Sequence, residues 1–212
     1  MLTIWGRRNA FNVQKVLWLM GELGLPHEHI PAGGDFGGLD DPAFRAMNPH
    51  GRVPVIDEDG TVVWESHAIL RYLAARDGRL WPADPAERSL ADRWMDWSLA
   101  TLQRDFMDLF WGHWRTPEAE RNAELIARKQ AACAAHFKLL DAHLAGRPYL
   151  AGDAFGLGDI PAGTVLYRYF GMGLETPPVP HVRAWYARLM ERPAYREHVM
   201  MPFDDMYGRL AY

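Results

Sequence analysis

Four residues in a short central segment, Val53, Pro54, Glu65 and Ser66, have the types and spacing to bind a small peptide. Ser66 opens a segment of helical period, where a serine hydroxyl can cap a free N–H group of the first turn. The same helix end attracts a carboxylate through its free N–H groups and the positive end of the helix dipole. Glu65 offers a partner for an ammonium group, and the backbone beside the proline offers N–H and C=O groups for an amide.

Pro54 interrupts a β-branched run from Val53 to Ile56. Proline cannot donate a hydrogen bond to a sheet, so it indicates an edge, a bulge or a special peptide bond. A trans bond at a sheet edge is the commoner arrangement, because only about 5–6% of X–Pro bonds in folded proteins are cis. In combination with Glu65 and Ser66, the proline nevertheless predicts a cis Val53–Pro54 bond.

The segments N-P-H-G-R-V-P-V-I (48–56) and E-S-H-A-I-L-R-Y-L (65–73) resemble the glutathione-binding core of the cytosolic glutathione S-transferases, in particular bacterial members of the serine-type and Nu-like classes. The resemblance implies a two-domain fold, glutathione as co-substrate with no metal, and an enzyme that transfers glutathione. It also implies a cytoplasmic homodimer.

The resemblance assigns roles to individual residues. The backbone of Val53 is expected to pair with the cysteinyl part of glutathione, and Glu65 with Ser66 to hold the γ-glutamyl end. Arg52 or His50 is expected near the glycine carboxylate. The residues expected around glutathione are Ala10, Phe11, Asn12, Phe36, His50, Arg52, Val53, Pro54, Glu65, Ser66 and His67.

Composition is consistent with a globular protein in a reducing compartment. The chain has 212 residues, 49% hydrophobic and 24% charged, with a formal net charge of −4. No basic stripe is present, so nucleic acid is not an expected partner. The single cysteine, Cys133, excludes an intrachain disulfide and is typical of a cytosolic protein. No signal peptide and no run of eighteen apolar residues is found, which predicts no membrane span.

The order of predicted elements divides the chain in two. The first part, 1–78, predicts the order β-α-β-α-β-β-α, a thioredoxin-like mixed sheet with helices on both faces. A linker with two prolines, 80–85, cannot continue a helix. The second part, 88–212, has helical period throughout and predicts an all-helical domain. The fold class is therefore α/β plus all-α.

Two long helices are predicted in the second part: one ends near 111–114 and the other runs from Pro117 to Leu144. Shorter helices are expected at 159–170, 182–190 and 194–199. Gly156 and Asp159 resemble the family's capping box with a weaker cap, and predict a folding element rather than a site.

Glutathione carries its own nucleophile, a thiol. A free thiol with a pKa near 8.5 is mostly protonated at neutral pH, so an enzyme must favour the thiolate. A donor from the loop after the first strand and the N-terminus of the next helix are the usual means. In the family that donor is a tyrosine, serine or cysteine, and the loop from Arg7 to Val13 contains none of them.

Aligning N-A-F-N-V-Q-K-V (9–16) with the serine-type pattern S-x-N-x-x-K-V places Ala10 at the serine and Asn12 at the asparagine two residues later. Resemblance to the Nu class then makes Asn12 the expected catalytic residue, the donor that holds the glutathione sulfur. A plain helix cap is the equally weighted alternative for Asn12. Asn9 and Arg8 are lesser candidates.

Aromatic residues of the first loop and of the second domain are the expected walls of the electrophile pocket, namely Phe11, Phe106, Phe110, Trp111 and Trp114. Packing in the core is the alternative for each of them. The glycine-rich segment 33–38 is either a loop that closes over glutathione or an ordinary surface loop. Tyr167 and Tyr169 either reach the cleft or pack in the core, and core packing is the expected arrangement for both.

Three functions are open from the sequence. The first is conjugation, in which the thiolate attacks an electrophilic small molecule. The second is disulfide reduction through bound glutathione, which needs no cysteine of the protein. The third is a glutathione-binding or regulatory protein without catalysis. The missing donor in the first loop favours the second and third, whereas the intact Val53–Ser66 segment disfavours the third.

Overall fold

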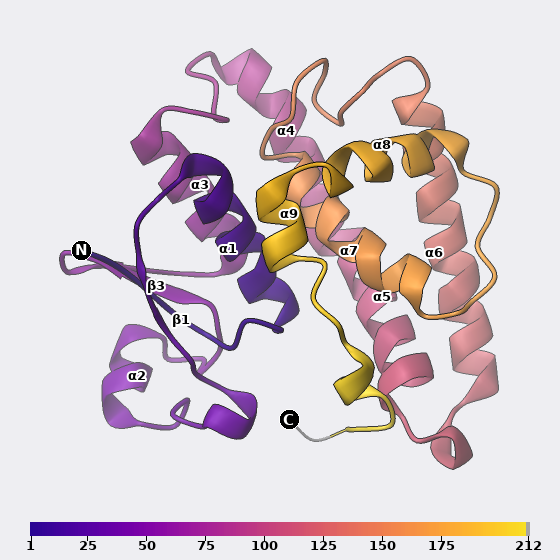
Figure 1. The fold of residues 1–212 in the computed structure, drawn as a ribbon, viewed down its shortest axis with the longest axis horizontal. Helices are drawn as coiled ribbons and strands as arrows, with labels where there is room; N and C mark the ends of the chain where they lie inside the picture. Colours follow the sequence, from indigo (N-terminus) through magenta and orange to yellow (C-terminus); the bar gives the residue numbers. More distant parts are fainter. Residues whose placement is uncertain (211–212) are drawn as a thin grey trace.

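A four-stranded sheet and a helical bundle make up the computed structural model, which describes residues 1–210 (Figure 1). The strands are β1 (Leu2–Trp5), β2 (Glu28–Ile30), β3 (Val55–Glu58) and β4 (Thr61–Trp64). Their order is β2-β1-β3-β4, with β1–β2 parallel and the other two pairs antiparallel. This is the mixed, thioredoxin-like sheet that the sequence predicted.

Three helices accompany the sheet: α1 (Phe11–Leu23), α2 (Pro42–Met47) and α3 (Ser66–Asp77). Helices α1 and α3 pack against each other on the side of the sheet that faces the bundle, whereas α2 lies on the other side (Figure 1). Helix α1 ends as predicted, with Gly24 in the left-handed conformation (φ 60°) that glycine adopts without steric cost.

A tight turn joins β3 and β4. Asp59 and Gly60, both with positive φ, form a two-residue turn, a pattern that matches the twist of the strands. Strand β3 begins at Val55 rather than Val53. The proline before it has no N–H for the sheet ladder, which explains the later start.

The bundle contains α4 (Pro85–Trp97), α5 (Gln103–Leu109), α6 (Ala123–Leu144), α7 (Asp159–Gly171), α8 (Pro180–Met190) and α9 (Pro193–His198). Wider, π-helical turns continue α4 into α5 (Ser98–Leu102) and extend α5 (Phe110–Arg115), so the predicted long helix is one continuous rod with two irregular turns. Short 3-10 turns lie at Gly34–Phe36, Glu118–Glu120 and Asp204–Met206. No helix of the described residues 1–210 is long and apolar enough to cross a membrane.

The start of α6 differs from the sequence prediction, whereas the start of α7 agrees with it. Helix α6 begins at Ala123 rather than Pro117, because Asn122 caps it by accepting a hydrogen bond from Leu125 N–H (2.9 Å). Helix α7 begins at Asp159 as predicted, although its N-cap is Gly158 rather than Gly156. The Asp159 carboxylate accepts from the N–H groups of Leu150 and Gly156, both at 3.0 Å. The carboxylate therefore ties the preceding turn to the helix, as expected of a folding element.

The linker and the contact between the two parts position the site. Helix α3 ends at Asp77 and α4 begins at Pro85, where the Asp84 side chain accepts from two N–H groups. Helix α1 packs against α7 and α9 as well as against α3, so it is shared by both parts of the fold (Figure 1). The N-terminal end of α1 consequently lies where the sheet part meets the bundle.

Candidate glutathione site

The joint between β4 and α3 carries the two residues expected at the γ-glutamyl end. Glu65 occupies the N-cap position with φ 68° and ψ 118°, and Ser66 is the first helical residue. Ser66 is therefore not the N-cap that the sequence predicted. Its side chain is buried, whereas Glu65 is exposed. The strained backbone of Glu65 directs the chain so that the free N–H groups of α3 are presented beside an acidic side chain.

The Val53–Pro54 peptide bond is cis, as predicted from the sequence. Val53 lies two residues before Val55, the first residue of β3, which pairs with Trp5 of β1 and Trp64 of β4. The backbone of Val53 is thus placed at the end of the central strands, next to the loop that follows β1.

Gly6 allows the loop after β1 to approach Val53. It has φ 149°, and a β-carbon built on it would lie 2.5 Å from Cγ2 of Val13 and 3.2 Å from Cβ of Val53. Only glycine fits between these side chains without a shift in the backbone. This close approach brings the start of α1 to the cis-proline segment.

Asn12 is the second residue of α1, and its side chain does not cap the helix. Ala10 is the N-cap and makes no side-chain cap bond. The Asn12 Oδ1 atom instead accepts from Lys15 Nζ (3.0 Å) and from Gln103 Nε2 (3.2 Å). The alternative interpretation of Asn12 as a plain cap is therefore wrong, because two donors from farther along the chain occupy the oxygen that capping would use.

Lys15 is fully buried beneath Asn12. Its Nζ atom also lies 2.5 Å from Gln103 Oε1 and 3.2 Å from Nε2 of His67. Burial lowers the pKa of Lys15 to about 7, and the charge of Glu65 opposes this change. Burial, followed by the charges of Lys15 and Arg71, lowers the pKa of His67 to about 2, so this imidazole is neutral at physiological pH.

His67 was expected at glutathione, and its side chain contacts α1. The side chain is buried, with its exposed fraction at 3%, and its ring faces Lys15 instead of the surface. Helical periodicity explains this burial, because His67 shares the face of α3 that packs on α1 with the buried residues Ile69 and Leu70.

The remaining residues expected at glutathione have different surroundings. Ala10 and Phe11 are buried at the start of α1, and Arg52 is exposed. The ring of His50 contacts Trp64 edge-on, with centroids 5.3 Å apart. Phe36, on the glycine-rich loop, exposes 62% of its surface. An exposed aromatic side chain on this loop is available to a ligand.

Arg8 and Asn9, the lesser candidates for the sulfur, engage the bundle. The Arg8 guanidinium lies 3.4 Å from Glu197 and 3.5 Å from the ring of His198, which places it toward α9. The Asn9 carbonyl accepts from Arg168 Nη2 of α7 at 2.7 Å. The same guanidinium nitrogen donates to Gln14 Oε1 at 3.2 Å. Arg168 thus holds the loop and α1 from the side of the bundle.

The aromatic residues expected at the electrophile pocket divide between the core and the half-buried surface. Phe106 and Phe110 are fully buried, and Phe11 packs on Phe106 with centroids 5.6 Å apart. In this arrangement the three rings belong to the core, which was the alternative interpretation. Trp111 and Trp114 are half-buried, so they retain surface that a substrate could contact.

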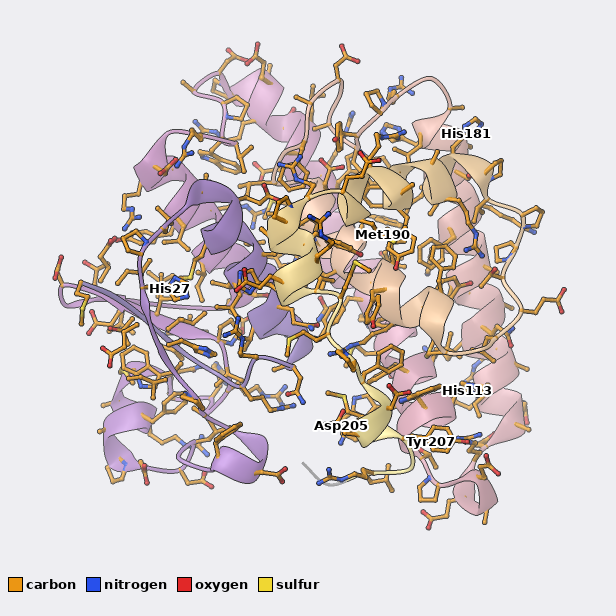
Figure 2. All side chains as sticks on the ribbon, in the orientation of Figure 1. His27, His113, His181, Met190, Asp205 and Tyr207 are labelled. Carbon is orange, nitrogen blue, oxygen red and sulfur yellow. The ribbon has the colours of Figure 1, made fainter. Side chains whose placement is uncertain are left out.

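A C-terminal segment that the sequence did not single out covers these aromatic residues. Phe203 and Tyr207 contact Trp114, with ring centroids 4.9 and 5.0 Å apart. Figure 2 shows Asp205 and Tyr207 on this segment, beside the lower end of α5. A cleft of about 70 Å³ lies between the segment and the glycine-rich loop, lined by Arg7, Asn9, Gly34, Asp35, Phe36, Arg115, Asp205, Met206 and Arg209.

A larger hollow of about 1040 Å³ lies elsewhere, between the linker and the turn before α7. Its walls include Trp81 and Phe155 and none of the residues expected at glutathione. Size alone is therefore a poor guide to the site in this molecule.

Lys15, Gln103 and Arg168 are functional candidates that the sequence analysis missed. Lys15 had a signal, because this charged residue lies between Val13 and Val16 in a helix that continues with the apolar run Val16–Met20. Gln103 and Arg168 had none, since a polar residue on a long helix is ordinarily solvated and nothing local indicates a distant partner.

Comparisons with known proteins agree with this geometry. The model of the glutathione S-transferase N-terminal domain matches residues 12–76, and that of the C-terminal domain matches 91–193. Glutathione S-transferase GstB of Escherichia coli K12 is 47% identical over 206 residues, covering 95% of this chain and 99% of that protein. Glutathione S-transferase 3 of Zea mays is 30% identical and covers 93% of each chain.

Among solved structures, the theta class glutathione S-transferase of Xanthomonas axonopodis pv. citri with glutathione bound has a TM-score of 0.91 and 51% identity, covering 95% of this chain and 98% of that one. Its apo form has a TM-score of 0.84 and 45% identity. With whole-length identity at this level, both domain models matched and the cis-proline, Glu65 and Ser66 segments in place, this chain belongs to the glutathione S-transferase family.

Proposed function

We propose that this protein is a glutathione transferase, which binds glutathione and promotes attack of its thiolate on an electrophilic small molecule. The observation that carries the proposal is the convergence of three backbone features: Val53 before the cis-proline, the free N-terminus of α3 at Ser66, and the N-terminus of α1 with Asn12. Gly6 permits the approach of the first and last of these. The family membership and the glutathione bound to the Xanthomonas relative support it.

Each part of glutathione has a partner in this scheme. The γ-glutamyl carboxylate binds the hydroxyl and N–H groups at the start of α3, and its ammonium pairs with Glu65. The cysteinyl amide pairs with the backbone of Val53. The glycine carboxylate lies near Arg52 or His50. A helix N-terminus favours an anionic ligand, so the start of α1 assists the thiolate.

Asn12 is the proposed donor to the sulfur. Its oxygen is occupied by Lys15 and Gln103, which leaves its amide nitrogen to donate outward. Phe36, Trp111, Trp114 and the covering C-terminal segment are the proposed surroundings of the electrophile, and a hydrophobic or flat electrophile suits them. We place the enzyme in the cytoplasm, as a homodimer.

Disulfide reduction through bound glutathione is the second candidate. One observation favours it: the first loop has no hydroxyl or thiol donor. The single cysteine of the chain is not a nucleophile either. Cys133 is buried, and burial raises its pKa to about 12, so a thiolate there is not accessible at neutral pH. Any thiol chemistry must use the sulfur of glutathione itself.

The experiment compares wild type with Ser66→Ala and Asn12→Ala. Calorimetry should show glutathione binding to the wild type and weaker binding to Ser66→Ala. Asn12→Ala should lower activity about tenfold or more, because a hydrogen bond to a charged group is worth about 1.5–3 kcal/mol. Chloronitrobenzene conjugation and disulfide reduction, measured side by side, discriminate the two enzymatic candidates. Glutathione binding without either activity would favour a non-catalytic protein, and absent binding would refute the proposal.

A further inference from the structure

Lys15 is a buried lysine near the N-terminal end of α1, and the proposed function gives it no role so far. Lys15 lies with no exposed surface, one helical turn after Asn12. A lysine is almost never fully buried without partners, because removing an ammonium from water is costly. Its position near the positive end of the α1 dipole adds to that cost. An anion bound at the start of the helix would offset both the cost of desolvation and the repulsion by the helix dipole.

The surroundings of Lys15 fit an ammonium rather than a neutral amine. An ammonium has three N–H donors, and three acceptors surround Nζ: Asn12 Oδ1 at 3.0 Å, His67 Nε2 at 3.2 Å and Gln103 Oε1 at 2.5 Å. The ring of Phe11 lies 4.9 Å from Nζ, within the range of a cation–π contact. The three hydrogen-bonding partners come from α1, α3 and α5, so both domains build this slot.

The cluster also fixes the Asn12 amide group. Lys15 Nζ and Gln103 Nε2 both donate to Asn12 Oδ1. An amide group held by its oxygen on the buried side presents its nitrogen on the other side. Asn12 is partly exposed, whereas Lys15 below it is not. The amide nitrogen is therefore left to the exposed side of Asn12, with a cation behind the amide group.

We propose that Lys15 is a positioning residue for the glutathione thiol: it orients the Asn12 amide toward the sulfur and supplies the charge that favours the thiolate. The inference rests on the proposed glutathione transferase function. In the step it assists, the S–H bond of glutathione breaks, the proton leaves to solvent and the sulfur keeps the electron pair. Asn12 then donates to the thiolate, and Lys15 does not touch it.

The charges around Lys15 should make the stabilisation of the thiolate depend on pH. Burial lowers its pKa to about 7 and Glu65 raises it. From α3, His67 is neutral and Arg71 is cationic at one turn's distance. Helix α5 contributes the uncharged Gln103, and the guanidinium of Arg168 of α7 lies 5.9 Å from the ring centroid of Phe11. A bound thiolate adds a negative charge, so it should raise the pKa of Lys15, just as Lys15 lowers that of the thiol; such coupling is reciprocal.

The first test is an ultraviolet titration of the thiolate of enzyme-bound glutathione. In Lys15→Met the thiol pKa should rise by about one pH unit, the lower end of the effect of a nearby charge. Lys129→Met is the matched control, because Lys129 pairs with Asp105 and Asp108 away from the site; it should leave the thiol pKa unchanged. Gln103→Leu, a variant in the other domain, should raise the thiol pKa by a smaller amount. It replaces Lys15→Met as the test variant if Lys15→Met does not fold.

The second test addresses the route of the effect. If Lys15 acts partly through Asn12, the shifts of Lys15→Met and Asn12→Ala should not add in the double variant, as contacting residues couple. The chain has three lysines, so NMR of isotope-labelled lysine can follow Lys15 directly. Its pKa should rise when glutathione is added.

The outcomes separate the two proposals. Absence of glutathione binding in the wild type overturns the proposed function. Binding and conjugation by the wild type, combined with an unchanged thiol pKa in Lys15→Met and Gln103→Leu, overturns the inference alone. A change in glutathione affinity without a change in thiol pKa also overturns it, because Lys15 would then act only as the counter-ion of Glu65.

Discussion

Ala10 is the residue at which the sequence differs most from the serine-type pattern, and its position in the structure also affects the stability of α1. It is the N-cap of α1, with φ −73° and ψ 127°, and its methyl group leaves the first N–H groups of the helix without a side-chain acceptor. A hydroxyl at this position would be both a helix cap and a donor near the sulfur. The effect on stability and the effect on catalysis can therefore be measured in one variant.

Ala10→Ser should raise the free energy of unfolding by about 0.5–2 kcal/mol, the usual difference between serine and alanine at an N-cap. It should also raise the conjugation rate, while glutathione affinity stays nearly constant. Denaturant unfolding and steady-state kinetics check the two effects separately. Greater stability with an unchanged rate would mean that the hydroxyl caps the helix and never reaches the sulfur.

The joint of β4 and α3 shows the conflict between stability and function at the scale of an element. Glu65 has a positive φ of 68°, a region that costs a residue other than glycine roughly 1–3 kcal/mol. The helix start beside it offers N–H groups, and the side chain offers the carboxylate, so the strain accompanies the proposed binding role.

Glu65→Gly and Glu65→Ala form a matched pair for this joint. Both remove the carboxylate and should weaken glutathione binding by a similar factor. Glu65→Gly should be more stable than Glu65→Ala by about 1–3 kcal/mol, because only glycine relieves the strain. Thermal unfolding and calorimetry test the pair, and equal stability of the two would show that the backbone is not strained here.

The start of α7 depends on one buried carboxylate. Asp159 Oδ1 accepts from Leu150 N–H and from Trp185 Nε1, both at 3.0 Å, and Oδ2 accepts from Gly156 N–H. Burial raises the pKa of Asp159 to about 6, and these hydrogen bonds with the charge of Arg192 oppose the rise. The side chain is thus mostly ionised at pH 7, with all three donors satisfied.

Asp159→Ala should lower the free energy of unfolding by about 3 kcal/mol or more at pH 7, because three buried donors lose their acceptor and each costs about 1–3 kcal/mol. A folded pKa above the unfolded value means that the folded state binds the proton first. The contribution of Asp159 to stability should consequently increase as the pH falls from 6 to 4, and Asp159→Asn should lack this dependence. Free energies of unfolding measured between pH 6 and pH 4 test the sign of this dependence.

At the scale of the whole molecule, the proposed site is completed by contacts between the two parts of the fold. Gln103 of α5 reaches Asn12 and Lys15, and Arg168 of α7 reaches Asn9 and Gln14. Helix α1 packs on α3, α7 and α9. The first loop is therefore held in place by residues that are distant in the sequence, and the domains are expected to unfold together.

We expect the protein to form a symmetric dimer through the exposed faces of α3 and α4. Within the chain, Arg71 of α3 pairs with Asp92 and Asp96 of α4, so the two helices present one joined surface. Leu90 of α4 is an exposed apolar residue there. Light scattering at micromolar concentration should give twice the mass of the chain, and Leu90→Glu should shift the equilibrium toward monomer. A wild-type monomer would contradict the prediction.

The local chemistry of the sequence determined the cradle between Val53 and Ser66. A proline without an N–H, an acidic turn that ends in glycine and a serine before a helical period are all signals within a few residues of their effect, so the cis bond, β4 and a helix from Ser66 were predicted correctly. The tertiary structure decided how Asn12 is used. Its oxygen is taken by Lys15 and by Gln103, 91 residues away, and His67 turns inward because α3 packs on α1. Which partner a polar side chain meets depends on distant segments brought together by folding, and no local pattern records it.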